Sequence, residues 1–287
     1  MEKEEFLVRL EQVASRKRLN RELFQSVVLD FYSAHGRDFA WRRTKDPYEI
    51  LVSEVMLQQT QTERVAQRYP KFLRRFPTAK ALSKASLAEV LSEWEGLGYY
   101  RRARNLHAAA VRVAEEHRGK VPVDYDTLLT LPGIGSYTAA AVSTFASGAI
   151  IPFIETNIRT VFLHLFYKNT DSVPDSDIIS LVGETLDPSD TRRWFYALMD
   201  LGVLIKQTRG NPNARSKHHR AQTTFSGSKR QMRAAILRYV VKQQQVTKDE
   251  LTEKLHANQQ HFDSAITELL EEGFIVRSRN GIYSVAG

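Results

Sequence analysis

The sequence predicts an all-α protein that ends in a small α+β unit. In the first 205 residues, apolar side chains recur at the spacing of amphipathic helices, and no segment fits a strand pattern better. After residue 273, apolar and polar residues instead alternate around Asn280-Gly281, a dipeptide typical of β-hairpin turns. A chain of 287 residues is long enough for more than one domain.

The helices of the N-terminal part are predicted in order from this spacing. The first expected helix places Leu23, Val27 and Phe31 on one face. The expected ranges are 22–34, 50–64, 124–129, 139–145, 178–187 and 192–206. Prolines are expected to separate short helices at Pro70, Pro77, Pro122 and Pro132.

A change of composition follows the last of these helices. Residues 206–220 hold five Lys or Arg, no Asp or Glu and no large apolar residue. Gly210 and Pro212 disfavour a helix there, so a loop or linker that buries no core face is expected.

The C-terminal residues again have a helical pattern. Helices are expected over 230–242 and 259–272, with another between them that starts at Thr247, an N-cap with Glu250 three residues on. Three helices and a hairpin within about 60 residues are typical of a winged helix, a helix-turn-helix variant.

Composition and charge narrow the classes of function. The absence of cysteine excludes disulfides, thiolate metal sites, cysteine nucleophiles and Cys-ligated iron–sulfur clusters. The formal charge of +8 favours a polyanionic partner. No apolar run reaches about 18 residues, and the N-terminus lacks an apolar signal core. We therefore expect no membrane association and a cytoplasmic location, near the nucleoid if the source is bacterial.

The most distinctive local motif is LPGIGSYTAAAV at 131–142. Gly133 and Gly135 allow a tight turn with close backbone approach, and a helix of small residues begins at Ser136. Unpaired amides at a helix N-terminus attract phosphate. We therefore expect the turn and the start of the helix to bind DNA, through Gly133, Gly135, Ser136 and Thr138. The alternative is an ordinary turn between two helices.

Two carboxylates lie in apolar surroundings. Glu54 belongs to SEVMLQQTQ, and Glu155 stands two residues before Asn157 in PFIETNIR. A carboxyl group buried in such a helix has a raised pKa and can donate a proton near neutral pH. Taken singly, each carboxylate is better explained by a structural role, such as a helix cap or an ion pair.

Four motifs together resemble one family. SEVMLQQTQ, GLGYYRRARNLH, LPGIGSYTAAA and ETNIR, in this order, are similar to those of the MutY family of A/G-mismatch adenine DNA glycosylases, in the helix-hairpin-helix superfamily. The resemblance covers about residues 20–206. It implies a helix-hairpin-helix DNA glycosylase fold of two lobes within 1–225, followed by the winged-helix domain at 226–287.

The resemblance implies roles for residues on both sides of the reacting base. Glu54 would protonate adenine and help to activate water, and Glu155 would stabilise positive charge on the sugar, where the family has Asp. Gln59 and Tyr99 would be wedges that enter the duplex; the alternative for Tyr99 is packing at a helix end. Asn157 would support the site or cap a helix.

Tyr137 stands where bifunctional relatives carry a lysine that forms a Schiff base. A phenol cannot form one, so the resemblance implies a monofunctional enzyme that leaves an abasic site.

The chain departs from the family at the iron–sulfur cluster. The four cysteine positions hold Lys206, Asn213, Ser216 and Gln222. We therefore expect no cluster, no metal and no other cofactor. The loop at 206–222 would still bind DNA phosphate through Arg209, Arg215 and Lys217, unless it is a solvated linker.

The C-terminal unit differs from the domain with which the family checks for 8-oxoguanine. Arg277 and Arg279 in its hairpin would contact phosphate or simply face solvent at a strand edge.

The expected function is therefore monofunctional excision of a flipped base from double-stranded DNA with a damaged or mismatched base, by a monomer. The base would be adenine in a mismatch, including one opposite 8-oxoguanine. Two alternatives stay open: excision of mismatched thymine or uracil or of a modified purine, and non-catalytic binding of DNA lesions.

Overall fold

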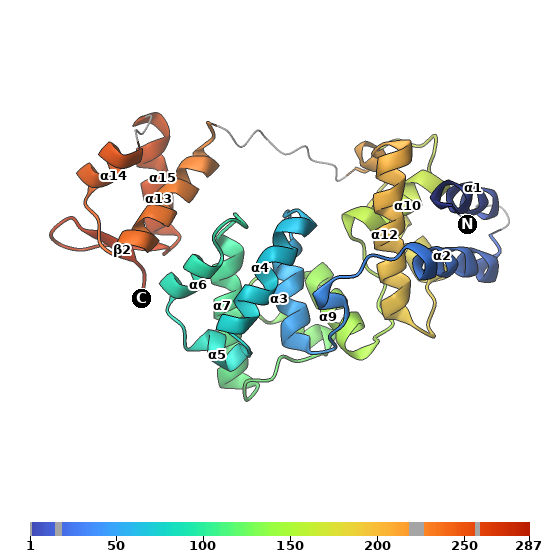
Figure 1. Cartoon of the computed structure of the whole chain (residues 1–287), viewed down its shortest axis with the longest axis horizontal. Coiled ribbons are helices and arrows are strands. Elements are labelled where there is room, and N and C mark those ends of the chain that lie inside the picture. The colour runs from blue at the N-terminus through green and yellow to red at the C-terminus, as the bar shows by residue number, and fades with distance from the viewer. Residues whose placement is uncertain (1, 15–18, 218–226, 256–258) are drawn as a thin grey trace. The chain divides into compact units, whose positions relative to one another are not determined.

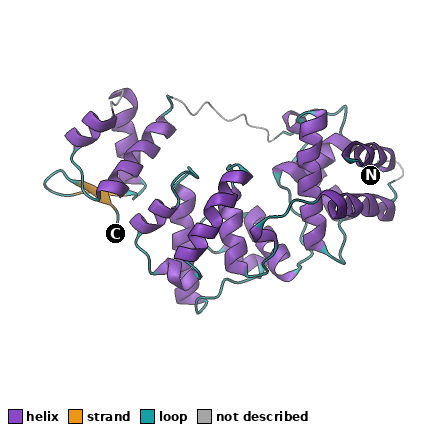
Figure 2. Cartoon of the chain, viewed as in Figure 1, coloured by secondary structure: helices purple, strands orange, loops and turns teal. Residues whose placement is uncertain are grey.

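The computed structural model describes residues 2–14, 19–217, 227–255 and 259–287. Within these ranges nearly all regular structure is helical, and the two strands of the sheet lie in the C-terminal part (Figure 2). The predicted fold class is thus confirmed. The chain divides into two compact units: unit 1 contains Met1–Leu51, Val123–Thr130 and Ile134–Ala221, and unit 2 contains Val52–Pro122, Leu131–Gly133 and Gln222–Gly287.

Unit 1 is built around its longest helix, α12, which packs against α2, α9 and α10 (Figure 1). The apolar face predicted for this helix is buried, with Trp194, Phe195 and Leu198 fully inside. The elements of unit 1 are α1 (Lys3–Val13), α2 (Arg21–His35), η1 (Ala40–Arg42), α8 (Tyr125–Leu129), α9 (Ser136–Ser147), α10 (Thr156–Phe166), α11 (Asp175–Thr185), α12 (Thr191–Arg209) and η2 (Pro212–Arg215).

A close approach and a buried ion pair hold α12 in place. A Cβ atom at Gly202 would lie 2.1 Å from the carbonyl oxygen of Asn157, so only glycine fits where α12 meets α10. The buried carboxylate of Asp200 accepts hydrogen bonds from the guanidinium groups of Arg37, at 2.6 Å, and Arg42, at 2.8 Å. These contacts tie the segment around η1 to α12.

Unit 2 begins within α3 (Pro47–Leu57) and continues with a cluster of packed helices. Its aromatic core joins Phe72 to Phe76 and Trp94, with ring centroids 5.0 and 5.9 Å apart. The helices that follow α3 are α4 (Thr62–Arg75), α5 (Ala79–Ser83), α6 (Leu87–Glu93) and α7 (Arg101–Glu116).

The C-terminal part of unit 2 has the predicted order of three helices and a hairpin. The elements are α13 (Lys229–Gln243), α14 (Lys248–Leu255), α15 (Gln259–Glu271), β1 (Ile275–Arg277) and β2 (Tyr283–Val285). The expected cap of α14 is present, since Thr247 and Glu250 exchange backbone-to-side-chain hydrogen bonds of 2.7 and 3.3 Å. β1 and β2 pair antiparallel, and Gly281 has a φ of +80° in the turn.

Two expectations about helix boundaries were wrong. The helix predicted over 50–64 stops at Leu57 and resumes as α4 at Thr62, because Gln59 adopts a left-handed φ of +53°. Pro70 does not separate helices but lies inside α4.

The basic segment at 206–220 was expected to be a loop or linker that buries no core face. It is instead helical at its start, and two of its polar residues are buried. α12 extends to Arg209, and Asn213 and Ser216 are only 5% and 6% exposed. Their burial is possible because hydrogen bonds replace apolar contacts: the Asn213 amide donates to Thr160 Oγ1 at 2.8 Å. The amide of Lys217 likewise donates to the carbonyl oxygen of Val173, at 3.0 Å.

No helix in the described ranges combines the length and the apolar character that a membrane crossing requires. The expected boundary at residues 225 and 226 lies outside the described residues.

Candidate active site

Glu54 lies on α3 with 3% of its surface exposed. The residues on both sides of it, from Ile50 to Met56, are all buried, because this stretch is apolar around nearly the whole helix. The expected burial of this carboxyl group is confirmed. The position of this carboxyl group makes Glu54 the candidate general acid.

Both predicted wedges stand on loops with left-handed backbone. Gln59 has a φ of +53° and Tyr99 a φ of +48°. Residues other than glycine rarely adopt this backbone conformation. Such strained residues persist only where surrounding contacts hold them, and they cluster at functional sites. The side chain of Gln59 is exposed, and that of Tyr99 is half-buried.

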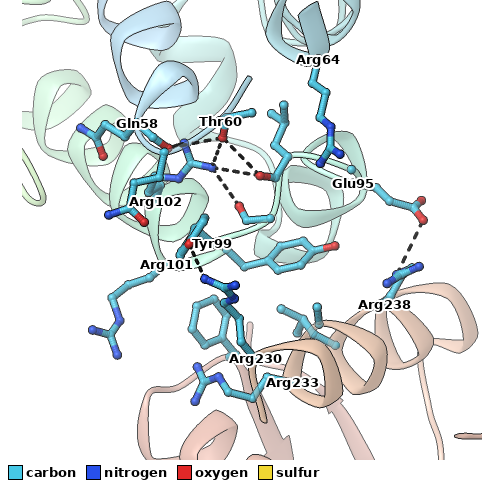
Figure 3. Close-up of a pocket in the computed structure, with 18 of the residues that line it drawn as sticks. Gln58, Thr60, Arg64, Glu95, Tyr99, Arg101, Arg102, Arg230, Arg233 and Arg238 are labelled. Carbon is cyan, nitrogen blue, oxygen red and sulfur yellow. Dashed lines mark hydrogen bonds and ion pairs between the residues drawn. The ribbon is translucent and has the colours of Figure 1, made fainter. Parts of the chain in front are cut away.

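One half-buried arginine, Arg102, holds both loops (Figure 3). The two terminal nitrogens of Arg102 lie 2.5–3.2 Å from six oxygen atoms. The acceptors are the carbonyl groups of Val55, Met56, Gln58, Leu97 and Gly98 and the hydroxyl of Thr60. This guanidinium explains why α3 ends where it does, because it binds the carbonyls of its last turn. Burial lowers the pKa of Arg102 to about 10, so it stays charged at neutral pH.

Sequence reasoning did not identify Arg102. A signal was present, because Arg101 and Arg102 open α7, and cations are unfavourable at a helix N-terminus, where the helix dipole is positive. A cation in such a place needs a local reason, and the carbonyl groups of the two loops provide it.

The glycine-rich turn has the predicted form. Gly133 has a φ of +74°, and a Cβ atom there would lie 2.5 Å from Cβ of Asn105, so the position requires glycine. Gly135 and Ser136 are exposed, and α9 begins at Ser136 as expected. The first amides of α9 therefore face solvent, as a phosphate site requires.

The next two residues of α9 face different surroundings. Thr138 is 2% exposed, which turns its hydroxyl into the protein rather than toward a ligand. Tyr137 is half-buried, and its ring meets Phe153 edge-on with centroids 5.7 Å apart.

Glu155 caps α10 and is linked to Lys206 through Asn157. The Glu155 carboxylate accepts hydrogen bonds from the Asn157 amide N–H at 2.7 Å and from its Nδ2 at 3.1 Å. Lys206 Nζ donates to Asn157 Oδ1 at 2.8 Å. Of the alternatives left open by the sequence, the N-cap is thus Glu155 and not Asn157.

The charge of Glu155 is set by opposing effects. Burial raises the pKa of the Glu155 carboxyl above its usual value, while the Asn157 amide and the Lys206 ammonium oppose that rise. Burial in turn lowers the pKa of Lys206. An anion beside a fixed cation is suited to stabilising positive charge that develops nearby.

The residues at the four cluster positions do not fit an iron–sulfur cluster. Lys206 donates to Asn157, Asn213 donates to Thr160, and none of the four positions has a thiolate. Gln222 lies outside the described residues. Across the part of the chain that the structure describes, no three His, Cys, Asp or Glu side chains gather closely enough to hold a metal ion.

The three cations predicted to bind DNA in this loop have different surroundings. Arg209 pairs with Glu4 and, at 3.4 Å, with Glu11. Arg215 donates to the carbonyl oxygen of Tyr167 at 3.0 Å, whereas the side chain of Lys217 is exposed. Contact of these residues with DNA stays a prediction.

The predicted site residues are divided between the two units. Unit 2 holds Glu54, Gln59, Tyr99 and Gly133, and unit 1 holds Gly135, Ser136, Tyr137, Thr138, Glu155 and Asn157. The meeting of the two carboxylates at one nucleotide therefore stays a prediction of the resemblance.

Comparison with known proteins assigns the family. Residues 52–181 match the model of the HhH-GPD superfamily of base excision DNA repair proteins. Over 279 residues the chain is 36% identical to an adenine DNA glycosylase of Mycolicibacterium smegmatis, an alignment that covers 91% of this chain and 95% of that protein. The chain belongs to this superfamily. Within it, the chain is a MutY-like DNA glycosylase of base excision repair.

Solved structures agree with this fold. A thermostable thymine-DNA glycosylase matches the glycosylase with a TM-score of 0.60 and 29% identity, over 67% of this chain and 90% of that one. Endonuclease III in a trapped covalent complex with DNA matches with a TM-score of 0.51 and 18% identity, over 72% of this chain and 92% of that one, which shows the shared fold alone.

Proposed function

We propose that the glycosylase releases adenine from a mispaired duplex, including adenine opposite 8-oxoguanine, and leaves an abasic site. The observation that carries this proposal is the 36% identity to an adenine DNA glycosylase over nearly the whole of both chains. The buried Glu54 and Glu155, the N-cap of α10, supply the two carboxyl groups that the chemistry needs. We further propose that it acts as a monomer without a cofactor, in the cytoplasm at the nucleoid if its source is bacterial.

The proposed reaction is hydrolysis of the N-glycosidic bond. Glu54 donates its proton to a ring nitrogen of the flipped adenine, and the bond between C1′ and the base breaks with its electron pair going to the base. The Glu155 carboxylate stabilises the positive charge left on the sugar. Water then adds to C1′ and returns a proton to Glu54. The division of roles between an acid and an anion follows glycoside hydrolysis.

Tyr137 supports a monofunctional reaction, because its phenol cannot form a Schiff base with the opened sugar. We therefore expect borohydride to trap no covalent complex between the protein and its DNA. A trapped complex would show that another amine attacks C1′ and would contradict the water step.

Mass spectrometry of bases released from a mixed panel of mismatched and damaged duplexes tests the proposal directly. We expect adenine among the released bases, strand cleavage only after alkali, and loss of release in Glu54→Gln. Tight binding to mismatched duplex with no base released from any A- or T-containing mismatch would replace the enzyme with a lesion-binding protein.

Excision of mismatched thymine is a second candidate. It is supported by the similarity to a thymine-DNA glycosylase at 29% identity. The same panel separates the two, because this candidate predicts thymine rather than adenine as the released base.

A further inference from the structure

A pocket in unit 2 joins the two wedge loops to the C-terminal helices (Figure 3). It encloses about 920 Å³ and is lined by the loops around Gln59 and Tyr99, the start of α7, and parts of α13 and α15. Its lining holds seven arginines against three glutamates, an excess of four positive charges. The arginines are Arg64, Arg68, Arg101, Arg102, Arg230, Arg233 and Arg238.

The three glutamates neutralise only part of this charge. Glu268 pairs with Arg233 at 2.6 Å. Glu272 pairs with Arg101 at 2.7 Å and with Arg233 at 2.8 Å. Glu95 faces Arg238 at 3.9 Å, and both side chains are about half-exposed, so this pair is weak.

Arg230 connects α13 to the wedge itself. Its guanidinium lies 5.2 Å from the centroid of the Tyr99 ring and donates a hydrogen bond to the Tyr99 hydroxyl. The C-terminal unit thus places a cation directly beside the residue expected to enter the duplex.

The C-terminal helices differ in charge, and this difference indicates which of them suits contact with an anion. α13 has five Lys or Arg and no acidic residue, whereas α15 has one Asp and two Glu and no Lys or Arg. In a helix-turn-helix domain the last of these helices enters the DNA groove. The acidic α15 is unsuited to that role, whereas the basic α13, which faces the wedge loops, suits contact with a polyanion.

We propose that this pocket binds backbone phosphates of the DNA beside Tyr99, with Arg230 and Arg238 of α13 as the phosphate ligands. The arginine fork matches a phosphate in geometry as well as in charge, and an aromatic ring beside it stacks on bases. The C-terminal unit therefore binds DNA through its first helix and not through α15. The inference rests on the proposed function and on the wedge role that the resemblance implies for Tyr99.

The test compares the full-length double variant Arg230→Ala/Arg238→Ala with Lys242→Ala/Lys254→Ala. Both remove two charges from the C-terminal unit, but Lys242 and Lys254 are exposed and lie outside the pocket lining. Binding is measured by fluorescence anisotropy on an undamaged duplex over a series of salt concentrations. The binding constant K falls as salt rises, so the slope of log K against log salt is negative. The pocket variant should make this slope shallower by about 2, and the control should leave it unchanged.

Equal slopes for the two double variants would overturn the proposal. Tighter binding by the pocket variant would also overturn it. That result would show that the contacts which the pocket arginines make within the protein compete with DNA binding. A synthetic acidic peptide should bind the pocket at least tenfold more weakly than the duplex, and equal affinity would identify a protein partner instead. Because undamaged DNA needs no turnover, these results can be read even if no adenine is released.

A second test looks for a gain of affinity. It does not require that the protein fold when the arginines are replaced. Glu95→Gln removes an exposed acid that faces Arg238, so it should bind duplex more tightly and steepen the salt slope. Unchanged affinity in this variant would contradict a role for Arg238 in binding phosphate.

Discussion

Arg102 shows how much a single residue contributes to this site. It joins the end of α3 to the loop that carries Tyr99, through oxygen atoms between 4 and 47 positions away in the sequence. Lysine retains the charge but offers no planar fork, so it reaches fewer of these acceptors. The carbonyl groups that lose their partner then favour other loop conformations.

We predict that Arg102→Lys lowers the rate of base excision about 100-fold, because small displacements of positioning groups have effects of that size. The measurement is single-turnover excision at a temperature where circular dichroism shows a folded protein, together with 2-aminopurine fluorescence to follow base flipping. Arg112→Lys is the control, since the half-exposed Arg112 lies on the same helix, outside the two loops, and pairs with Glu116. Unaltered flipping in Arg102→Lys would contradict the positioning role.

Lys206 is a second single residue with a predicted effect, in this case on the pH range of the reaction. Its ammonium favours the charged form of Glu155, so Lys206→Met should raise the pKa of Glu155 further. Since the reaction needs the carboxylate, activity should then be lost at a higher pH as the solution is acidified. The acid limb of the kcat profile measures this shift.

The exposed Lys84→Met is the control and should leave the acid limb in place. If the acid limb of the kcat profile also keeps its pH position in Lys206→Met, Glu155 does not control that limb.

At the scale of elements, the contact between α10 and α12 positions the cap that Glu155 forms. A methyl group at Gly202 would overlap the Asn157 backbone, so the two helices would have to separate. We predict that Gly202→Ala lowers the free energy of unfolding by about 3 kcal/mol and also slows excision. Denaturant unfolding measures the first effect.

Gly183→Ala is the matched control, because its added Cβ would approach only the Pro152 side chain, at 3.4 Å. It should be neutral or slightly stabilising. Equal stability of the two variants would show that the close contact between the helices is not required.

At the scale of the whole molecule, hydrogen bonds hold the loop in which the resemblance places the four cluster positions. Asn213 and Lys206, at two of these positions, donate to residues of α10. We predict that the purified protein contains far less than one iron atom per chain and that chelators leave its thermal unfolding unchanged. A lowered unfolding temperature after chelation would reveal a metal that contributes to stability.

The sequence by itself determined the features that depend on local pattern. Apolar spacing predicted α2, α12 and the C-terminal helices, because burial of one face has the same period as the helix. The apolar run around Glu54 predicted its burial, and the two glycines predicted the turn before α9. The missing cysteines excluded a thiolate cluster without any coordinates.

Only the tertiary structure decided the features that depend on distant partners. The break after Leu57 follows from Arg102, and the burial of Asn213 follows from Thr160, 53 positions away. The link from Glu155 to Lys206 and the basic pocket beside Tyr99 likewise join segments that are remote in the chain. Such contacts leave no periodic trace in the sequence, because a hydrogen bond or an ion pair depends on where two segments meet and not on the residues beside each partner.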